Sequence, residues 1–260
     1  MLADFLLRLA AGLTFSLLLL SPTSTARPAP GRKPLANANF FRTQLLVALG
    51  LTVGALLWLR AEAGWPLLGC LLAAAACSFL GSVSWSLERS PGGVALLVLT
   101  ALALTAALGL HTAGRATSDA ALAGPLAGAF SSALLLGAAT SAMLMGHNYL
   151  VAPTMTMTPL YRLLGALAVA LAVRAVADGW ALAQWTRDFD LGNLRADERL
   201  WLPVRWLVGL AAPAALCWMA FQTARIRSTQ SATGILYVAV IFCFLGELTA
   251  LLLRPAGLAL

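Results

Sequence analysis

Four ionisable side chains stand inside long apolar runs of this sequence, and they are Arg174, Asp178, Arg205 and Glu247. A charge within lipid is costly, so such residues usually face the interior of a helix bundle, pair with one another or mark an ion or substrate path. Arg174 and Asp178 are four residues apart and share one face of a helix. Because the four formal charges sum to zero, we expect an intramembrane charge cluster that either ties helices together or lines a proton path or polar ligand site.

The depths of these charges predict which ones meet. At about 1.5 Å of rise per residue, Arg174 and Glu247 both lie roughly 20 Å from the cytoplasmic ends of their helices, and Asp178 about 6 Å further. Arg205 lies about one turn below the outer end of its helix. Two helices with opposite charges at matching depth lower their desolvation cost by facing each other. We therefore predict a direct salt bridge between Arg174 and Glu247, with Asp178 and Arg205 adjoining it.

A second polar group is His147, Asn148 and Tyr149, at the start of an uncharged stretch that runs to Pro159. The three side chains offer hydrogen-bond donors and acceptors at headgroup depth, and the Pro-bounded residues after them resist helix. Such a group can hydrogen-bond a quinone carbonyl, with His147 as proton donor. The competing interpretation is a capped helix end. We expect a small polar pocket lined by His147 and Asn148, separate from Glu247.

Metal and haem sites are not expected. No C-x-x-C or Cys/His grouping with metal-ligand spacing occurs, and the cysteines all lie inside apolar runs: Cys70, Cys77, Cys217 and Cys243. Only His111 and His147 could ligate haem iron, and the predicted topology places them at opposite faces of the membrane. The sequence also lacks a P-loop and the motifs GxGxxG, GxSxG and HExxH. Quinone is the one cofactor that we consider.

The elements that must position these residues are membrane-spanning helices. Hydrophobic residues make up 60% of the 260-residue chain and charged residues 10%, against roughly 25% charged in a soluble domain. Runs of about 20 apolar residues, enough to cross a bilayer, occur at 4–21, 43–59, 65–87, 93–110, 124–146, 160–183, 201–222 and 232–253. We predict an all-α, polytopic transmembrane bundle of about eight helices, a single domain over residues 1–260 with no soluble domain.

The first run has two interpretations. Residues 1–26 resemble a signal peptide in their apolar core and in the small residues Ser24-Thr25-Ala26. The basic charge that should precede the core is weak, because Asp4 stands before the lone Arg8. We therefore interpret the segment as a retained helix. Two GxxxG pairs, Gly50/Gly54 and Gly124/Gly128, suggest close helix packing.

The distribution of charge in the connections predicts the orientation. Basic residues accumulate in the connections that follow every odd-numbered helix, and these are Arg27, Arg32, Lys33, Arg42, Arg89, Arg162, Arg225 and Arg227. Most acids lie in the other connections. Basic loops stay in the cytoplasm, so both termini are predicted outside. The net charge of +7 is explained by this topology and not by nucleic acid. An Arg- and Ala-rich composition favours a bacterial inner membrane.

These features leave three functional hypotheses. The first is a membrane subunit of a larger complex with protein partners, an electron-transfer assembly that contacts quinone near His147. The second is a small-solute or proton transporter or channel, with Arg174, Asp178 and Glu247 on a polar path. The third is a membrane-embedded lipid-modifying enzyme, for which the sequence provides no metal-ligand or nucleophile set. The sequence does not decide whether the protein is an enzyme.

Overall fold

The computed structural model describes residues 1–21, 36–87, 92–115, 122–151, 155–188 and 196–253, and these contain helices and no strand. In chain order the helices are α1 (Leu2–Leu20), α2 (Ala38–Leu59), α3 (Trp65–Ser86), α4 (Gly93–Ala113), α5 (Ala123–Val151), α6 (Thr158–Asp188), α7 (Ala196–Trp206), the π-helical turn η3 (Leu207–Ala211), α8 (Ala212–Arg225) and α9 (Thr229–Leu253).

Eight helical segments of the described chain are long and apolar enough to cross a membrane, counting Arg199–Arg225 (α7, η3 and α8) as one span. Large apolar side chains such as Leu57, Val176 and Trp218 are exposed on the sides of these helices. Lipid solvates such surfaces, and a helix satisfies its own backbone hydrogen bonds within it. The predicted all-α transmembrane bundle is therefore confirmed, and the protein is a multi-pass membrane protein.

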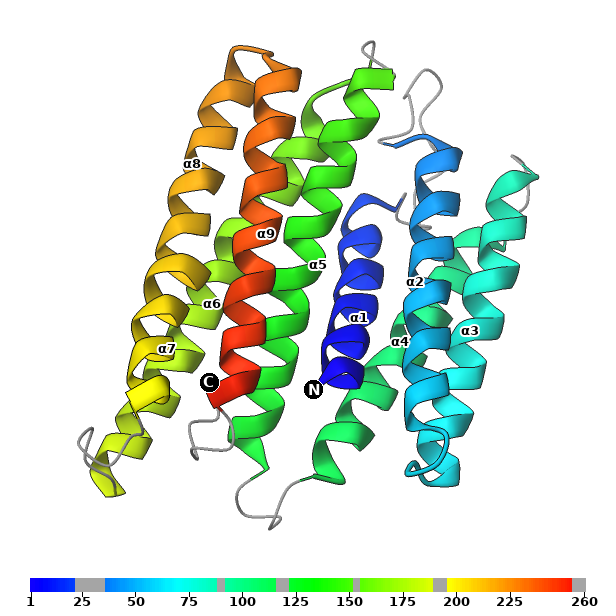
Figure 1. Ribbon diagram of the computed structural model, residues 1–260. Helices are drawn as coiled ribbons and strands as arrows, with labels where there is room; N and C mark the ends of the chain where they lie inside the picture. Colours follow the sequence, from blue (N-terminus) through cyan, green and yellow to red (C-terminus); the bar gives the residue numbers. More distant parts are fainter. Residues whose placement is uncertain (22–35, 88–91, 116–121, 152–154, 189–195, 254–260) are drawn as a thin grey trace.

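Two helices form the centre of the bundle. In the most apolar stretches of α1 and α5, 67% and 72% of the residues are buried, whereas the share in the other spans is 50% or less. Helix α1 lies between α5 on one side and α2 and α4 on the other, and both chain ends lie at the same end of the bundle (Figure 1). The first apolar run is thus an integral part of the packing, in agreement with its interpretation as a helix.

Backbone contact between α1 and α5 depends on two glycines. A Cβ atom added to Gly12 would lie 1.7 Å from the Ala133 carbonyl oxygen, and one added to Gly137 would lie 2.0 Å from the Gly12 carbonyl carbon. The GxxxG pairs expected from the sequence do not make such contacts. Gly50 and Gly124 are exposed, with nothing within 4 Å of an added Cβ, because their helix faces point away from the bundle.

The span predicted as one helix at 201–222 is interrupted by η3. The Ala212 N–H donates to the Leu207 carbonyl five residues back, which is the π-helical pattern. Pro213 follows at once and has no N–H to donate to Gly209, so the proline accounts for the local widening. Here Gly209 meets Gly246 of α9, where an added Cβ would lie 2.3 Å from the Gly209 Cα.

The end of α5 also differs from the prediction. The helix continues to Val151, so the polar residues 147–149 lie on its last turns and not in a loop. The Pro-bounded stretch after Tyr149 was expected to resist helix, and the helix ends at Val151, while Pro153 lies outside the described residues. Pro159 is tolerated because it occupies the first turn of α6, where its missing N–H needs no partner.

Candidate functional site

Glu247 of α9 is the centre of a buried ionic cluster. Its side chain is fully buried, and its Oε1 accepts hydrogen bonds from Arg174 Nε at 2.9 Å and Arg205 Nη2 at 3.0 Å. Its Oε2 accepts from Arg174 Nη2 at 3.3 Å and from the Ser132 hydroxyl. The predicted salt bridge between Arg174 and Glu247 is therefore present.

Asp178 completes the predicted cluster from α6. Its Oδ2 lies 2.8 Å from Arg205 Nε and 2.6 Å from Arg205 Nη2, and its Oδ1 lies 3.2 Å from Arg174 Nη1. Arg205 thus contacts both carboxylates. The closely packed Gly209 and Gly246 leave room for its guanidinium, because a Cβ atom added to Gly246 would lie 3.1 Å from Arg205 Nη1. The side chains of the predicted cluster are all buried: Arg174, Asp178, Arg205 and Glu247.

Helix α5 contributes neutral groups that the sequence reasoning did not identify. Arg174 Nη1 donates to the Gly128 carbonyl and to Ser131 Oγ, each at 3.2 Å, and Ser132 donates to Glu247. These contacts satisfy donors and acceptors that the ion pairs leave open, as a buried charge requires. Serine is common in membrane helices, where it often bonds to its own backbone, so its residue type alone gave no signal.

Arg8 of α1 is a fifth charged member of the cluster. Its Nη1 lies 3.6 Å from Glu247 Oε2, and its side chain is 2% exposed. Its Nε and Nη1 have no hydrogen-bond partner among the described residues. We call Arg8, Arg174, Asp178, Arg205 and Glu247 the central network. The sequence predicted a neutral group of four charges, and Arg8 corrects this, because three arginines and two carboxylates carry a formal charge of +1.

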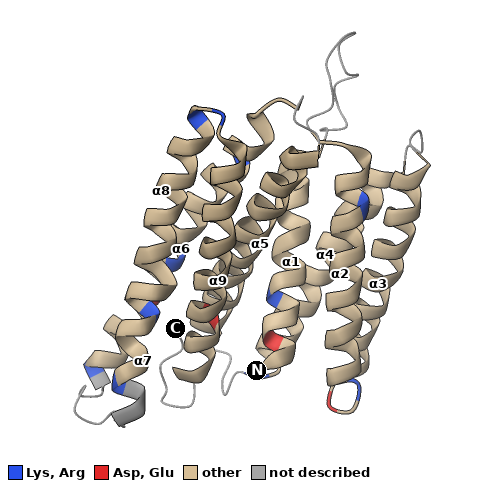
Figure 2. Cartoon of the chain, turned by 45° about the horizontal axis from the view of Figure 1, so that its top comes forward, with Lys and Arg blue, Asp and Glu red and all other residues tan. Residues whose placement is uncertain are grey.

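The central network joins distant parts of the chain inside the membrane. Figure 2 shows basic and acidic positions within the span of the helices, away from their ends. The five side chains come from α1, α6, α7 and α9, and α5 supplies the serines. Removing one partner of such a buried pair strands the other charge, at a cost of about 3–5 kcal/mol. The excess positive charge can accommodate an anionic oxygen, which would neutralise it and accept hydrogen bonds from Arg8.

A second charged group lies at the end of the bundle where α1 begins. The buried Asp4 accepts a hydrogen bond from Arg115 Nη1 at 2.6 Å, and its Oδ1 lies 3.2 Å from His111 Nε2. His111 and Arg115 also line a cavity of about 410 Å³, to which Glu62 and Trp58 contribute from the α2 side. We call this cavity the His111 pocket. The sequence reasoning missed it, although His111/Arg115 and Asp4/Arg8 both have the i,i+4 spacing of residues on one helix face.

Of the three residues predicted to bind quinone, only Asn148 and Tyr149 bond to the same segment. Asn148 Nδ2 donates to Met155 Sδ at 3.5 Å, and the buried Tyr149 donates its hydroxyl hydrogen to the Thr156 carbonyl. These two side chains therefore connect the end of α5 to the segment before α6. His147 is exposed and contributes to neither bond. The two hydrogen bonds fix the end of α5, as the interpretation of a capped helix end expects. Quinone binding at His147 stays a prediction.

Neither the cysteines nor comparisons with known proteins identify a further site. Cys217 and Cys243 are buried, Cys70 and Cys77 are half-buried, and all four are free thiols. Among the described residues, no group of three or more His, Cys, Asp or Glu side chains is placed to hold a metal ion. No protein-family model, curated protein or solved structure matches the chain. The geometry of the central network and the His111 pocket is therefore the basis for a functional conclusion.

Proposed function

We propose that the protein is a membrane transporter for small solutes that carry an anionic group, which bind at the central network. The observation that carries the proposal is Arg8, whose buried Nε and Nη1 have no hydrogen-bond partner among the described residues and whose charge leaves the network at +1. Buried N–H donors without partners are costly. A carboxylate or similar oxyanion would accept from one of these nitrogens and balance the charge, because charge-assisted hydrogen bonds from arginine to a carboxylate are strong.

The interruption of the seventh span supports the same proposal. Many transporters bind their substrates beside helices that are broken within the membrane, and π-helical turns are frequent at functional sites. The π turn η3 begins two residues after Arg205, and its Gly209 contacts Gly246, one residue before Glu247. A local change of helical pattern here would shift Arg205 relative to Glu247. Such a shift offers a way to open and close the site.

The proposal also covers the membrane in which the protein resides and its orientation in that membrane. We infer that the protein resides in a bacterial inner membrane with both termini outside. At the opposite end of the bundle from the termini, the described charged residues are basic: Arg42, Arg162, Arg225 and Arg227. Glu62 lies at the same end as the termini. Cytoplasmic connections are enriched in Lys and Arg, which supports this orientation.

A second candidate function is a subunit of an electron-transfer complex that contacts quinone or a partner at His147. It is favoured by one observation, the exposure of the His147 side chain near the basic end of the bundle. An exposed imidazole is available to a group outside this chain. Gentle purification followed by identification of co-purifying subunits tests this candidate, and a lone monodisperse chain would count against it.

The transporter proposal is tested with purified protein and a panel of carboxylates from acetate to succinate. We expect binding by titration calorimetry, uptake into proteoliposomes, and a loss of affinity of at least tenfold in Arg8→Gln. Arg42→Gln is the matched control, because Arg42 is exposed near the start of α2. Arg8→Gln should fold as well as the parent, since it removes a surplus cation with unpartnered donors. If no carboxylate binds, or if Arg8→Gln binds as the parent does, the proposal is wrong.

A further inference from the structure

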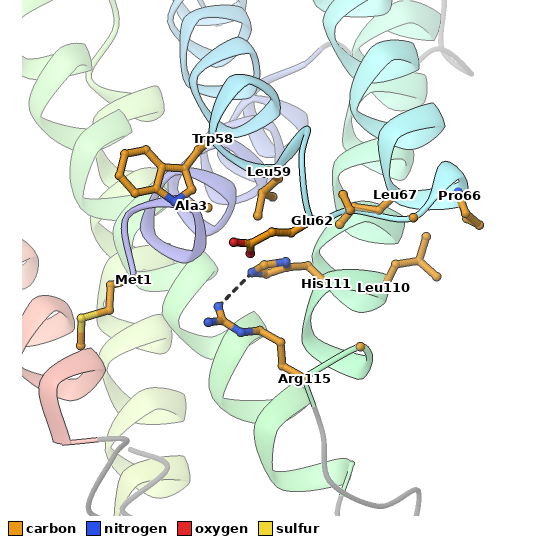
Figure 3. A pocket seen from close by; sticks show the side chains of 13 residues that line it. Met1, Ala3, Trp58, Leu59, Glu62, Pro66, Leu67, Leu110, His111 and Arg115 are labelled. Atoms are coloured by element: carbon orange, nitrogen blue, oxygen red, sulfur yellow. Dashed lines mark hydrogen bonds between the residues drawn. The ribbon is translucent and has the colours of Figure 1, made fainter.

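The His111 pocket presents charges of both signs to one cavity. Its volume of about 410 Å³ lies in the range of small-molecule sites. Figure 3 shows Glu62, His111 and Arg115 directed into the same space, with Trp58 at its edge. The pocket is built from α1, the α2–α3 turn and the end of α4, so three parts of the chain fix its shape.

The cationic side of the pocket has hydrogen-bond donors that Asp4 does not use. Arg115 Nη1 bonds to Asp4, but the Arg115 side chain is 55% exposed. A guanidinium has five N–H donors in a fixed fork, so the remaining donors can bind a carboxylate from the pocket. Asp4 also contacts His111 and therefore fixes both basic side chains at this wall.

The side of the pocket formed by the end of α2 and the turn after it can hold a cation. Glu62 lies on the turn after α2, is exposed, and lines the pocket. Trp58, one helical turn earlier, is 62% exposed and lines the same space. A carboxylate and an indole face are the two groups that proteins most often present to an ammonium ion. The pocket thus pairs a carboxylate-binding wall with an ammonium-binding wall.

The geometry points to a binding site for small zwitterions, specifically amino carboxylates such as α-amino acids, in the His111 pocket. The solute's carboxylate bonds to Arg115 and its ammonium to Glu62 and Trp58. This inference rests on the proposed transport function and names its substrate class. Asp4 behind the pocket and Arg8 of the central network are four residues apart on α1 and share one face. Arg8 therefore lies about one helical turn deeper along α1 than Asp4, which holds Arg115.

The experiment compares three ligands of nearly equal size on the full-length protein in lipid nanodiscs: alanine, propionate, which lacks the ammonium, and ethylamine, which lacks the carboxylate. We expect alanine to bind at least tenfold more tightly than either of the others. Glu62→Gln should weaken alanine at least tenfold and leave propionate unchanged. Arg60→Gln is the control, because Arg60 is exposed on the same turn but does not line the pocket. Glu62 is exposed, so its variant should fold normally.

The outcomes separate this inference from the transport proposal. If propionate binds in an Arg8-dependent manner but alanine binds no more tightly, the zwitterion site is wrong and the transport proposal stands. The same holds if Glu62→Gln leaves alanine affinity unchanged. If none of the three ligands binds, both are overturned.

Discussion

The central network and the His111 pocket use the same chemistry at two depths. In both, arginine donates to a carboxylate from another helix at 2.6–3.0 Å. Arg174, Asp178, Arg205 and Glu247 have almost no exposed surface, whereas Arg115 is more than half exposed. Water and ions screen the exposed pocket pair much more than the buried network. The difference indicates that the network pairs contribute more to the stability of the fold than the pocket pair does.

The largest expected effect comes from Glu247→Gln. This change leaves Arg174 and Arg205 buried without their shared carboxylate, and we expect the free energy of unfolding to fall by about 3–5 kcal/mol. Denaturant unfolding in a fixed detergent measures it. Glu62→Gln removes an exposed acid and should change stability by less than about 0.5 kcal/mol.

A double variant checks the origin of this loss. Arg174→Gln combined with Glu247→Gln should cost less than the sum of the two single changes, because the members of a buried pair are coupled. Equal stabilities for Glu247→Gln and Glu62→Gln would show that burial does not distinguish the two regions.

An intermediate effect is expected from Gly137→Ala. Helix α1 carries both Arg8 of the network and Asp4 of the pocket, and a Cβ on Gly137 would meet the backbone of Gly12 at 2.0 Å. The two helices must move apart, at about 1–3 kcal/mol for an overpacked core. Gly50→Ala has open space around the new Cβ and should be neutral or stabilising by up to about 1 kcal/mol. If both variants unfold alike, α1 does not need its backbone contact with α5.

The smallest effect is expected from Arg115→Gln. Asp4 keeps His111 as a partner, and a half-exposed pair contributes about 1 kcal/mol or less. The loss should shrink further in high salt, because mobile ions screen this pair. Thermal unfolding at low and high ionic strength measures both, with Arg60→Gln as the reference. A loss as large as that of Glu247→Gln would mean that the pocket is a structural element like the network.

The sequence predicted those parts of the fold and site that depend on composition. Eight spans follow from the lengths of the apolar runs, and four network residues follow from the rarity of charge within them. Arg8 was missed because a cation near the start of an apolar run is also typical of a signal peptide. The role of Arg8 depends on the position of α1 at the centre of the bundle, and no local sequence pattern reveals that position.

Close packing was the part that local patterns could not predict. Gly50 and Gly124 fit GxxxG, yet the backbone contacts occur at Gly12/Gly137 and Gly209/Gly246, because contact depends on which helix face meets a neighbour. Pro213 was a visible signal for an irregular turn, but a proline does not specify a π turn on its own. The end of α5 was placed too early because the apolar run stops at residue 146, whereas the helix continues through the polar residues 147–149 to Val151.

The contact between Arg8 and Glu247 has a consequence for biosynthesis. Arg8 lies on α1 and Glu247 on α9, so the other described helices are all made between them. At about 5–20 residues per second, α1 waits roughly 10–50 s for α9. Once Arg205 has been made and before Glu247 follows, the nascent bundle holds three network arginines with Asp178 as the one network carboxylate. The last helix therefore completes the ionic core, and a chain that stops before α9 retains buried cations that quality control can recognise.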